Sequence, residues 1–222
     1  MRSLPNLLTG FRLLAAPGIA WVHLALPRPD ADLAALILFA AAAVTDWLDG
    51  KLARALNAES AFGRMMDPIA DKAMVAVALL LIVVQTGLSA VSLIPAVVIL
   101  CRETAVSGLR EFLAGRVAVP VTRLAKWKTG VQMTALGALL AWAWAEQRAA
   151  LLFHQMGPAD YMRTVAGELP DARGVALAHW GAQALPWIGF ALLWIAAVLT
   201  AITGWSYFRA AFARGAETGK ET

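Results

Sequence analysis

Long apolar runs alternate with short polar breaks along the chain, a pattern typical of several membrane-spanning helices. The polar or helix-breaking segments are "LPRPDAD" at 26–32, "TGLSAVS" at 86–92 and "GRVAVPVT" at 115–122. Each intervening run is close to the ~20 residues that one span requires. A short interfacial helix is expected before the first span. We expect six spans, at residues 11–26, 33–53, 64–86, 90–113, 124–145 and 185–208.

The composition agrees with a single all-α membrane domain over residues 1–222. Of these residues 60% are hydrophobic and only 15% are charged, outside the usual range of soluble domains. The one cysteine, Cys101, excludes an internal disulfide and a cysteine-based metal site. The polar stretch 146–184 is expected to be an extracytoplasmic loop, and its His154 and His179 lack metal-ligand spacing.

Six spans would place the basic residues very unevenly across the membrane. All but four of the 19 basic residues would lie on one side. Because basic residues collect on the cytoplasmic side, both termini are predicted to be cytoplasmic. The net charge of +4 then describes a membrane face opposite anionic lipid and gives no sign of a nucleic-acid partner. The four exceptions are Arg28, Arg148, Arg163 and Arg173.

Four aspartates interrupt two of the apolar runs: Asp46, Asp49, Asp67 and Asp71. At about 100° per residue, Asp46 and Asp49 lie roughly 60° apart on a helix, and Asp67 and Asp71 are one turn apart. The turn "NAESAFG" would join the two helices as a hairpin, so that both acidic faces meet. An ionisable side chain inside a membrane costs at least ~2.5 kcal/mol unless it faces water or a partner. These aspartates are therefore candidates for a functional site.

Several carboxylates at one point need nearby positive charge, since like charges raise one another's pKa. Oxygen ligands without histidine or cysteine favour Mg²⁺ or Mn²⁺, and four acids suit two ions ~3.5–4 Å apart. Such ion pairs act in phosphoryl transfer, where they neutralise phosphate oxygens. The alternative is that the acids pair with neighbouring basic residues, namely Lys51, Arg54, Arg64 and Lys72.

The segment from 46 to 71 reads DxxDGxxARx8GxxxDxxxD and resembles the signature of the CDP-alcohol phosphatidyltransferases at every defined position. That family comprises six-helix, usually dimeric membrane enzymes that replace the CMP of a CDP-linked lipid with an alcohol. The resemblance implies that Asp46, Asp49 and Asp67 hold two Mg²⁺ or Mn²⁺ ions. Asp71 would complete this metal site and act as the catalytic base. The implied CDP-diacylglycerol site consists of Gly50, Ala53, Arg54 and Gly63, with Asn6, Thr9 and Arg12 of the N-terminal helix covering the nucleotide.

Further stretches resemble the bacterial members that use sn-glycerol 3-phosphate as acceptor: "LPNLLTGFRL" at 4–13, "CRETAVSGLREF" at 101–112 and "KWKTGVQM" at 126–133. This resemblance implies an enzyme of the bacterial cytoplasmic membrane, with its active site facing the cytoplasm and phosphatidylglycerol phosphate as product. A phosphorylated acceptor needs fixed cations, and arginine can bind phosphate bidentately. The basic residues available on the fourth and fifth predicted helices are Arg102, Arg110, Arg123, Lys126 and Lys128, and the candidate acceptor residues chosen from them are Arg102, Arg110, Lys126 and Arg123.

Other readings of the same residues stay open. The acceptor could be inositol phosphate, serine or phosphatidylglycerol. In a different class, deep carboxylates with arginines are also found in secondary transporters. In the expected topology the charges occupy the cytoplasmic half of the spans, whereas a transport path would continue through the other half.

Overall fold

The structure, a computed structural model, describes residues 3–56, 61–112 and 123–218, and its regular secondary structure there is entirely α-helical. The all-α prediction is therefore confirmed. The helices are α1 (Ser3–Ala25), α2 (Asp30–Leu56), α3 (Ala61–Gln85), α4 (Ala90–Phe112), α5 (Arg123–Met156), α6 (Pro158–Val165) and α7 (Val175–Thr218).

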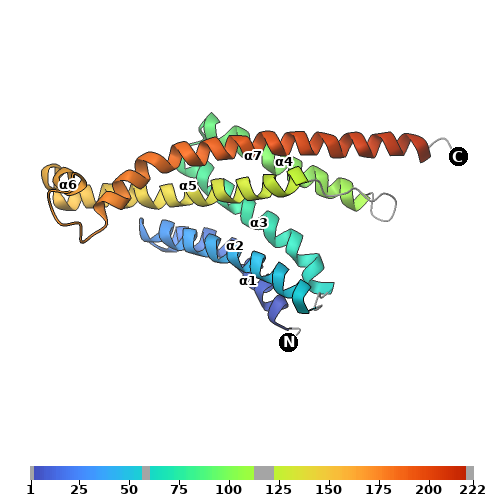
Figure 1. Ribbon diagram of the computed structural model, residues 1–222, viewed down its shortest axis with the longest axis horizontal. Helices are drawn as coiled ribbons and strands as arrows, with labels where there is room; N and C mark the ends of the chain where they lie inside the picture. Colours follow the sequence, from blue (N-terminus) through green and yellow to red (C-terminus); the bar gives the residue numbers. More distant parts are fainter. Residues whose placement is uncertain (1–2, 57–60, 113–122, 219–222) are drawn as a thin grey trace.

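The helices form an elongated bundle. α5 and α7 lie side by side along its long axis, and α4 packs on α7 (Figure 1). α1 packs against α2 and α3, both of which also contact α5. The beginning of α1 and the end of α7 point towards the same side of the molecule, whereas α6 lies at the opposite end (Figure 1).

Glycines mark two of the chain reversals. α3 ends at Gln85, and Gly87 follows with a φ of 63°, a backbone conformation that other residues rarely adopt. Gly157 has a φ of 79° and separates α5 from α6, and Pro158 then occupies the first position of α6. Proline suits that position because its missing N–H would have no partner inside the helix.

The main hydrophobic core joins α1, α2, α3, α4, α5 and α7 in the middle of the bundle. Side chains that are fully buried there include Ile19 of α1, Leu79 of α3, Ile99 of α4, Leu139 of α5 and Leu193 of α7. Many large apolar side chains point outwards instead, and a membrane rather than water would cover them. The core therefore fixes the relative positions of the helices that carry the aspartates.

Three stretches of the described residues are long and apolar enough to cross a membrane: Leu7–Ala25, Ala90–Leu109 and Val175–Arg209. The count of six spans goes beyond this finding and stays a prediction. The N-terminal helix was expected to run into the first span, and α1 does run without a break from Ser3 through the first candidate span. Its early residues continue the helical hydrogen bonding of the apolar stretch. The interfacial position of its first turns stays a prediction.

The stretch 146–184, expected to be a loop, is mostly helical. α5 continues to Met156, α6 follows, and α7 begins at Val175. A second, smaller core holds these elements together: Leu152, Tyr161, Val175 and Ala178 are buried against one another. The extent of helix was not anticipated, because this small apolar set comes from three separate helices and lies among charged residues. The extracytoplasmic position of the stretch stays a prediction.

Candidate functional site

Carboxylates from two helices converge on one guanidinium group. Arg12 of α1 forms ion pairs with Asp46 of α2 and with Asp67 and Asp71 of α3. Its Nη2 lies 2.7 Å from Asp67 Oδ1 and its Nη1 lies 3.0 Å from Asp71 Oδ1. The predicted convergence of these three aspartates is therefore observed, and we call Arg12, Asp46, Asp67 and Asp71 the aspartate cluster.

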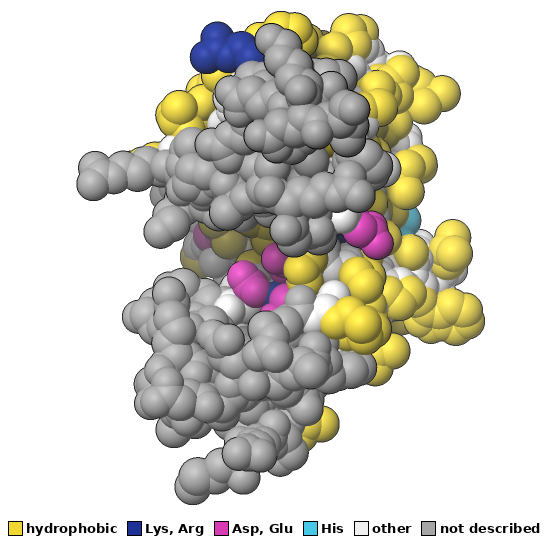
Figure 2. Space-filling model, turned by 90° about the vertical axis from the view of Figure 1, so that its right-hand side faces the viewer, with side chains coloured by type: hydrophobic (Ala, Val, Ile, Leu, Met, Phe, Trp, Pro, Cys, Tyr) yellow, Lys and Arg dark blue, Asp and Glu magenta, His cyan; other side chains and the backbone are white. Residues whose placement is uncertain are grey.

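The aspartate cluster is closed on the side of α1 and open on the other. The Arg12 side chain is only 2% exposed, whereas those of Asp46, Asp67 and Asp71 are 51%, 41% and 56% exposed. Thr9, one turn before Arg12, donates a hydrogen bond of 2.9 Å to Asp67 Oδ1. Figure 2 shows acidic side chains in the hollow of the face that it displays. The exposed carboxylates can therefore contact a ligand that enters from the open side.

Several predicted residues of this site lie where only the backbone is described. Asp49, Gly50, Ala53 and Arg54 continue α2 beyond Asp46, and Asn6 lies in the first turns of α1. Their side chains fall outside the described part of the structure, so their predicted roles stay predictions. Gly63 is buried on α3, one turn before Asp67.

A second charged group joins α4, α5 and α7. Lys128 of α5 forms an ion pair with Glu103 Oε1, and Arg102 Nη1 lies 3.2 Å from the same oxygen. Lys128 is only 6% exposed, an uncommon state for a lysine. Arg102 also donates a hydrogen bond of 3.1 Å to Thr203 Oγ1 of α7. We call Arg102, Glu103 and Lys128 the basic cluster, since its two cations share one carboxylate.

Close packing holds Arg102 in place. Its guanidinium carbon lies 5.8 Å from the centre of the Tyr207 ring, within the range of a cation–π contact. A Cβ at Gly204 would lie only 2.7 Å from Arg102 Cγ. Any side chain at position 204 would therefore displace Arg102.

The other predicted acceptor residues cannot be compared with this arrangement. Arg110 lies near the end of α4, and Arg123 and Lys126 lie in the first turn of α5. Their side chains are outside the described part of the structure. Lys128 of the "KWKTGVQM" stretch was counted among the basic residues of these helices but was not singled out as an acceptor residue, and the role of Glu103 was not foreseen. The lysine-to-glutamate contact spans 25 residues, so no local spacing could indicate it.

The aspartate cluster has the donor chemistry of a divalent-cation site. Its exposed groups are carboxylate oxygens from two rigid helices, and hard ions such as Mg²⁺ prefer such oxygens. Among the described residues, no group of three or more histidine, cysteine, aspartate or glutamate side chains is positioned to hold a metal ion. The fourth predicted ligand, Asp49, is not included in that comparison because its side chain is not described. Arg12 supplies the positive charge that the carboxylates need.

The long apolar helices, together with the two charged clusters among them, indicate a helical membrane protein with a polar functional site. The sequence comparison assigns the family: residues 2–202 match the family described as CDP-alcohol phosphatidyltransferase. The chain belongs to this family, so the resemblance inferred from the signature is confirmed. It is therefore a transferase.

Named relatives cover almost the whole chain. A protein of Cereibacter sphaeroides is 49% identical over 211 residues, which cover 94% of this chain and 95% of that protein. One of Rickettsia typhi is 38% identical over 95% of this chain and 97% of its own length. One of Escherichia coli K12 is 41% identical over 157 residues, 68% of this chain and 85% of that protein. Each of these relatives is named CDP-diacylglycerol–glycerol-3-phosphate 3-phosphatidyltransferase.

Proposed function

We propose that this protein transfers the phosphatidyl group of CDP-diacylglycerol to sn-glycerol 3-phosphate, giving phosphatidylglycerol phosphate and CMP. The single observation that carries the proposal is the 49% identity with the Cereibacter sphaeroides protein of that name, over nearly the full length of both chains. The aspartate cluster and the basic cluster supply the two kinds of group that this reaction needs.

The aspartate cluster is the proposed reaction centre. Asp71 accepts the proton of the glycerol C1 hydroxyl, and the resulting oxygen attacks the phosphorus that carries diacylglycerol. The bond from this phosphorus to the CMP oxygen breaks, and CMP leaves. Asp71 is suited to this step because its carboxylate is about half exposed and held by Arg12. General-base catalysis of this kind contributes ~10²- to 10⁴-fold in rate.

Asp46, Asp49, Asp67 and Asp71 are the proposed ligands of two Mg²⁺ or Mn²⁺ ions. When bound, such ions neutralise the diphosphate oxygens and stabilise the leaving CMP. The positive charge of the ions would also balance the carboxylates, which would then no longer need Arg12 for this. Arg12 can then bind substrate phosphate, consistent with the expectation that α1 covers the nucleotide. The other proposed contacts to CDP-diacylglycerol are Asn6, Thr9, Gly50, Ala53, Arg54 and Gly63.

The basic cluster is the proposed site for the acceptor phosphate. Arg102 and Lys128 carry two positive charges on different helices and meet at the carboxylate of Glu103. A phosphate dianion would satisfy both cations. Glu103 fixes the two cations before the acceptor arrives. Arg110, Arg123 and Lys126 are proposed to contribute from the ends of the same helices.

The decisive assay measures CMP release by the purified protein. The reaction contains CDP-diacylglycerol, Mg²⁺ or Mn²⁺, and one alcohol from a panel: glycerol 3-phosphate, glycerol, inositol phosphate, serine or phosphatidylglycerol. We expect release with glycerol 3-phosphate and only background release with the others. Equal release with serine or inositol phosphate would contradict the proposed acceptor. No CMP release with any member of the panel would contradict the proposed donor.

The membrane arrangement completes the proposal. Six spans would place both termini and both charged clusters in the cytoplasmic half, where glycerol 3-phosphate is dissolved and CDP-diacylglycerol can enter from the inner leaflet. A homodimer is proposed because members of the family are usually dimeric. Many large apolar side chains are exposed along the spans and leave room for both lipid and subunit contacts.

A further inference from the structure

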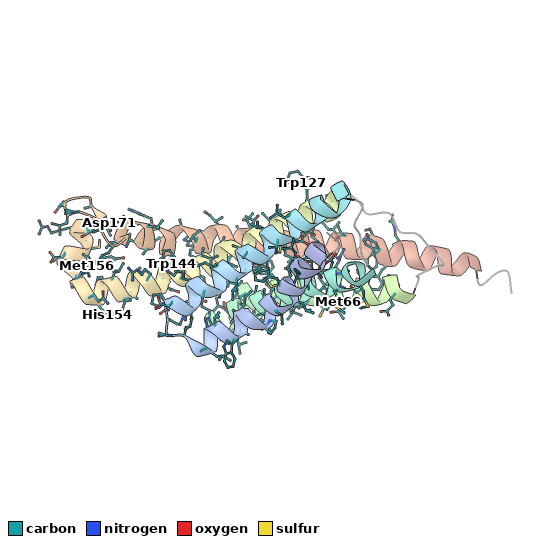
Figure 3. All side chains as sticks on the ribbon, turned by 90° about the horizontal axis from the view of Figure 1, so that it is seen from below. Met66, Trp127, Trp144, His154, Met156 and Asp171 are labelled. Atoms are coloured by element: carbon teal, nitrogen blue, oxygen red, sulfur yellow. The ribbon has the colours of Figure 1, made fainter. Side chains whose placement is uncertain are left out.

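A pocket lies far from both charged clusters. Its volume is about 330 Å³, and it lies between the start of α2, the distant half of α5 and the start of α7. Arg148 follows Lys128 by 20 residues on α5, which corresponds to about 30 Å at 1.5 Å per residue. Trp144 lies towards the end of the molecule that carries Asp171, away from Met66 (Figure 3). We call this the distal pocket, and its main lining residues are Asp30, Leu33, Trp144, Arg148, Arg173 and Leu177.

The distal pocket is lined by two arginines and one aspartate, and no ion pair joins them in the described part of the structure. Within the described part of the chain, no side chain forms an ion pair with Arg148, Arg173 or Asp30. The nearby Arg28 and Asp32, in contrast, form an ion pair at 2.8 Å. Arg148 Nη2 instead donates a hydrogen bond of 3.4 Å to the backbone oxygen of Arg173. This contact joins the Arg148 side chain to the backbone of Arg173, and both residues line the pocket.

The other wall of the distal pocket is apolar, and a candidate membrane span ends near it. Leu33, Trp144 and Leu177 contribute hydrocarbon surface, and Leu177 is largely exposed. The candidate span Leu7–Ala25 ends on this side of the bundle, five residues before Asp30. Tryptophan and arginine are common where acyl chains meet headgroups. An amphipathic ligand can therefore place its polar end on the charges and its chains along the apolar wall.

We propose that the distal pocket binds the headgroup of a phospholipid that carries a phosphodiester and a primary ammonium group, as in phosphatidylethanolamine. The phosphate contacts Arg148 and Arg173, since guanidinium groups bind phosphate oxygens through paired hydrogen bonds. The ammonium group contacts Asp30. Phosphatidylglycerol offers no cation to Asp30, and the quaternary ammonium of phosphatidylcholine cannot donate a hydrogen bond to it.

Native mass spectrometry of the full-length protein tests this proposal. Detergent-solubilised protein is given equal amounts of phosphatidylethanolamine, phosphatidylglycerol and phosphatidylcholine with the same acyl chains, and the retained lipids are counted. We expect preferential retention of phosphatidylethanolamine by the wild type. Loss of two charge-assisted contacts in Arg148→Gln/Arg173→Gln should lower this retention by about tenfold or more. In Asp30→Asn, retention of phosphatidylethanolamine should fall to that of phosphatidylglycerol.

Arg163→Gln is the matched control, because Arg163 is an exposed arginine of the neighbouring α6 that already contacts Glu168 at 3.2 Å. It should bind lipid like the wild type. Equal retention of all three lipids by the wild type, or unchanged retention in the double variant, would overturn the site. If millimolar free phosphoethanolamine displaced the bound lipid, the headgroup alone would be sufficient for binding. That result would overturn the proposal that the ligand must be a lipid. The single variants Arg148→Gln and Arg173→Gln serve if the double variant does not fold.

Discussion

Arg12 supplies positive charge to the three carboxylates of the aspartate cluster. One guanidinium group contacts three carboxylates that would otherwise repel one another. The three aspartates could be anticipated from their spacing, because Asp67 and Asp71 recur at one turn and Asp46 lies on the adjoining helix. Arg12 was expected near this site, but its ion pairs with the aspartates could not be anticipated, because they span 34, 55 and 59 residues of sequence.

Arg12→Gln should destabilise the protein, and divalent cations should reverse the effect. Removing one partner of a fully buried ion pair costs ~3–5 kcal/mol, and we expect about 1–2 kcal/mol here because the carboxylates are half exposed. The measurement is thermal unfolding of purified protein in EDTA and in Mn²⁺. Arg163→Gln, which alters an exposed arginine, is the control. An unfolding temperature equal to that of the wild type in EDTA would show that Arg12 does not neutralise the carboxylates.

Asp71→Asn should remove the proposed proton acceptor without disturbing the bundle. The amide has nearly the same shape as the carboxylate but cannot take up the proton, so the turnover number should fall by about 10²- to 10⁴-fold. The unfolding temperature should stay close to that of the wild type, because the amide group of the variant still offers an oxygen to Arg12. Retention of more than a tenth of the wild-type rate would rule out general-base catalysis by Asp71.

Arg102→Ala should weaken binding of the acceptor and leave binding of the donor unchanged. A hydrogen bond to a charged group contributes ~1.5–3 kcal/mol, so the Michaelis constant for glycerol 3-phosphate should rise about 10- to 100-fold. Gly204→Ala should act in the same direction, because the new Cβ would displace Arg102 without removing its charge. If the Michaelis constant for CDP-diacylglycerol rose instead, the basic cluster would belong to the donor site.

At the scale of elements, α5 and α7 form the most extensive helix contact, and a small residue allows their close approach. A Cβ at Gly189 of α7 would lie 2.6 Å from Leu139 Cγ, whereas one at Gly137 of α5 would meet only Phe39, at 3.9 Å. Gly189→Ala should therefore destabilise the protein by about 1–3 kcal/mol through overpacking. Gly137→Ala is the control and should be neutral or stabilising by up to ~1 kcal/mol. Thermal unfolding of the two variants checks this, and equal unfolding temperatures would contradict the packing.

Asp171 makes the start of α7 sensitive to pH. Its carboxylate accepts hydrogen bonds from the backbone N–H groups of Ala176 at 3.0 Å and Val175 at 2.7 Å, and these bonds lower the pKa of Asp171. A lowered pKa in the folded state means that the stabilisation is present above the unfolded pKa of about 4 and is lost as the pH falls through the folded value.

Hydrogen exchange of the first amides of α7 measures this effect. In Asp171→Ala these amides should exchange faster than in the wild type at neutral pH, and the difference should shrink as the medium is acidified below the folded pKa. Asp171→Asn is the non-titrating control: its single amide oxygen can accept only one of the two bonds, so its exchange should be intermediate at neutral pH and should not change through the titration of Asp171. Identical exchange in the alanine variant and the wild type would contradict the cap.

The helical core of the molecule could be predicted from the apolar runs, but the fold of 146–184 could not. Periodicity indicates a helix only where one face is clearly apolar, and the small core around Leu152 and Tyr161 takes single residues from three different helices. The basic cluster could also be predicted only in part. Arg102 was anticipated from its depth in an apolar run. Its contact with Glu103, which Lys128 also contacts, depends on how α4 and α5 pack.

At the scale of the whole molecule, the uneven distribution of basic residues predicts how the chain crosses the membrane. Four arginines lie apart from the rest, and two of them, Arg148 and Arg173, line the distal pocket. Asp160 on α6 has an exposed side chain at the same end of the bundle, whereas α7 ends at the opposite end (Figure 1). If basic residues mark the cytoplasmic side, α6 is extracytoplasmic and the C-terminus is cytoplasmic.

Labelling in intact bacterial cells measures this orientation. In a Cys101→Ser background, Asp160→Cys should react with a membrane-impermeant maleimide without cell lysis, because the exposed α6 would face the outside. Green fluorescent protein fused after Thr222 should fluoresce, since the C-terminus would remain in the cytoplasm, where this protein folds. Labelling at position 160 only after lysis, together with a dark fusion, would mean that the chain is inverted. The basic cluster would then face away from dissolved glycerol 3-phosphate, and the proposed acceptor could not reach it from the cytoplasm.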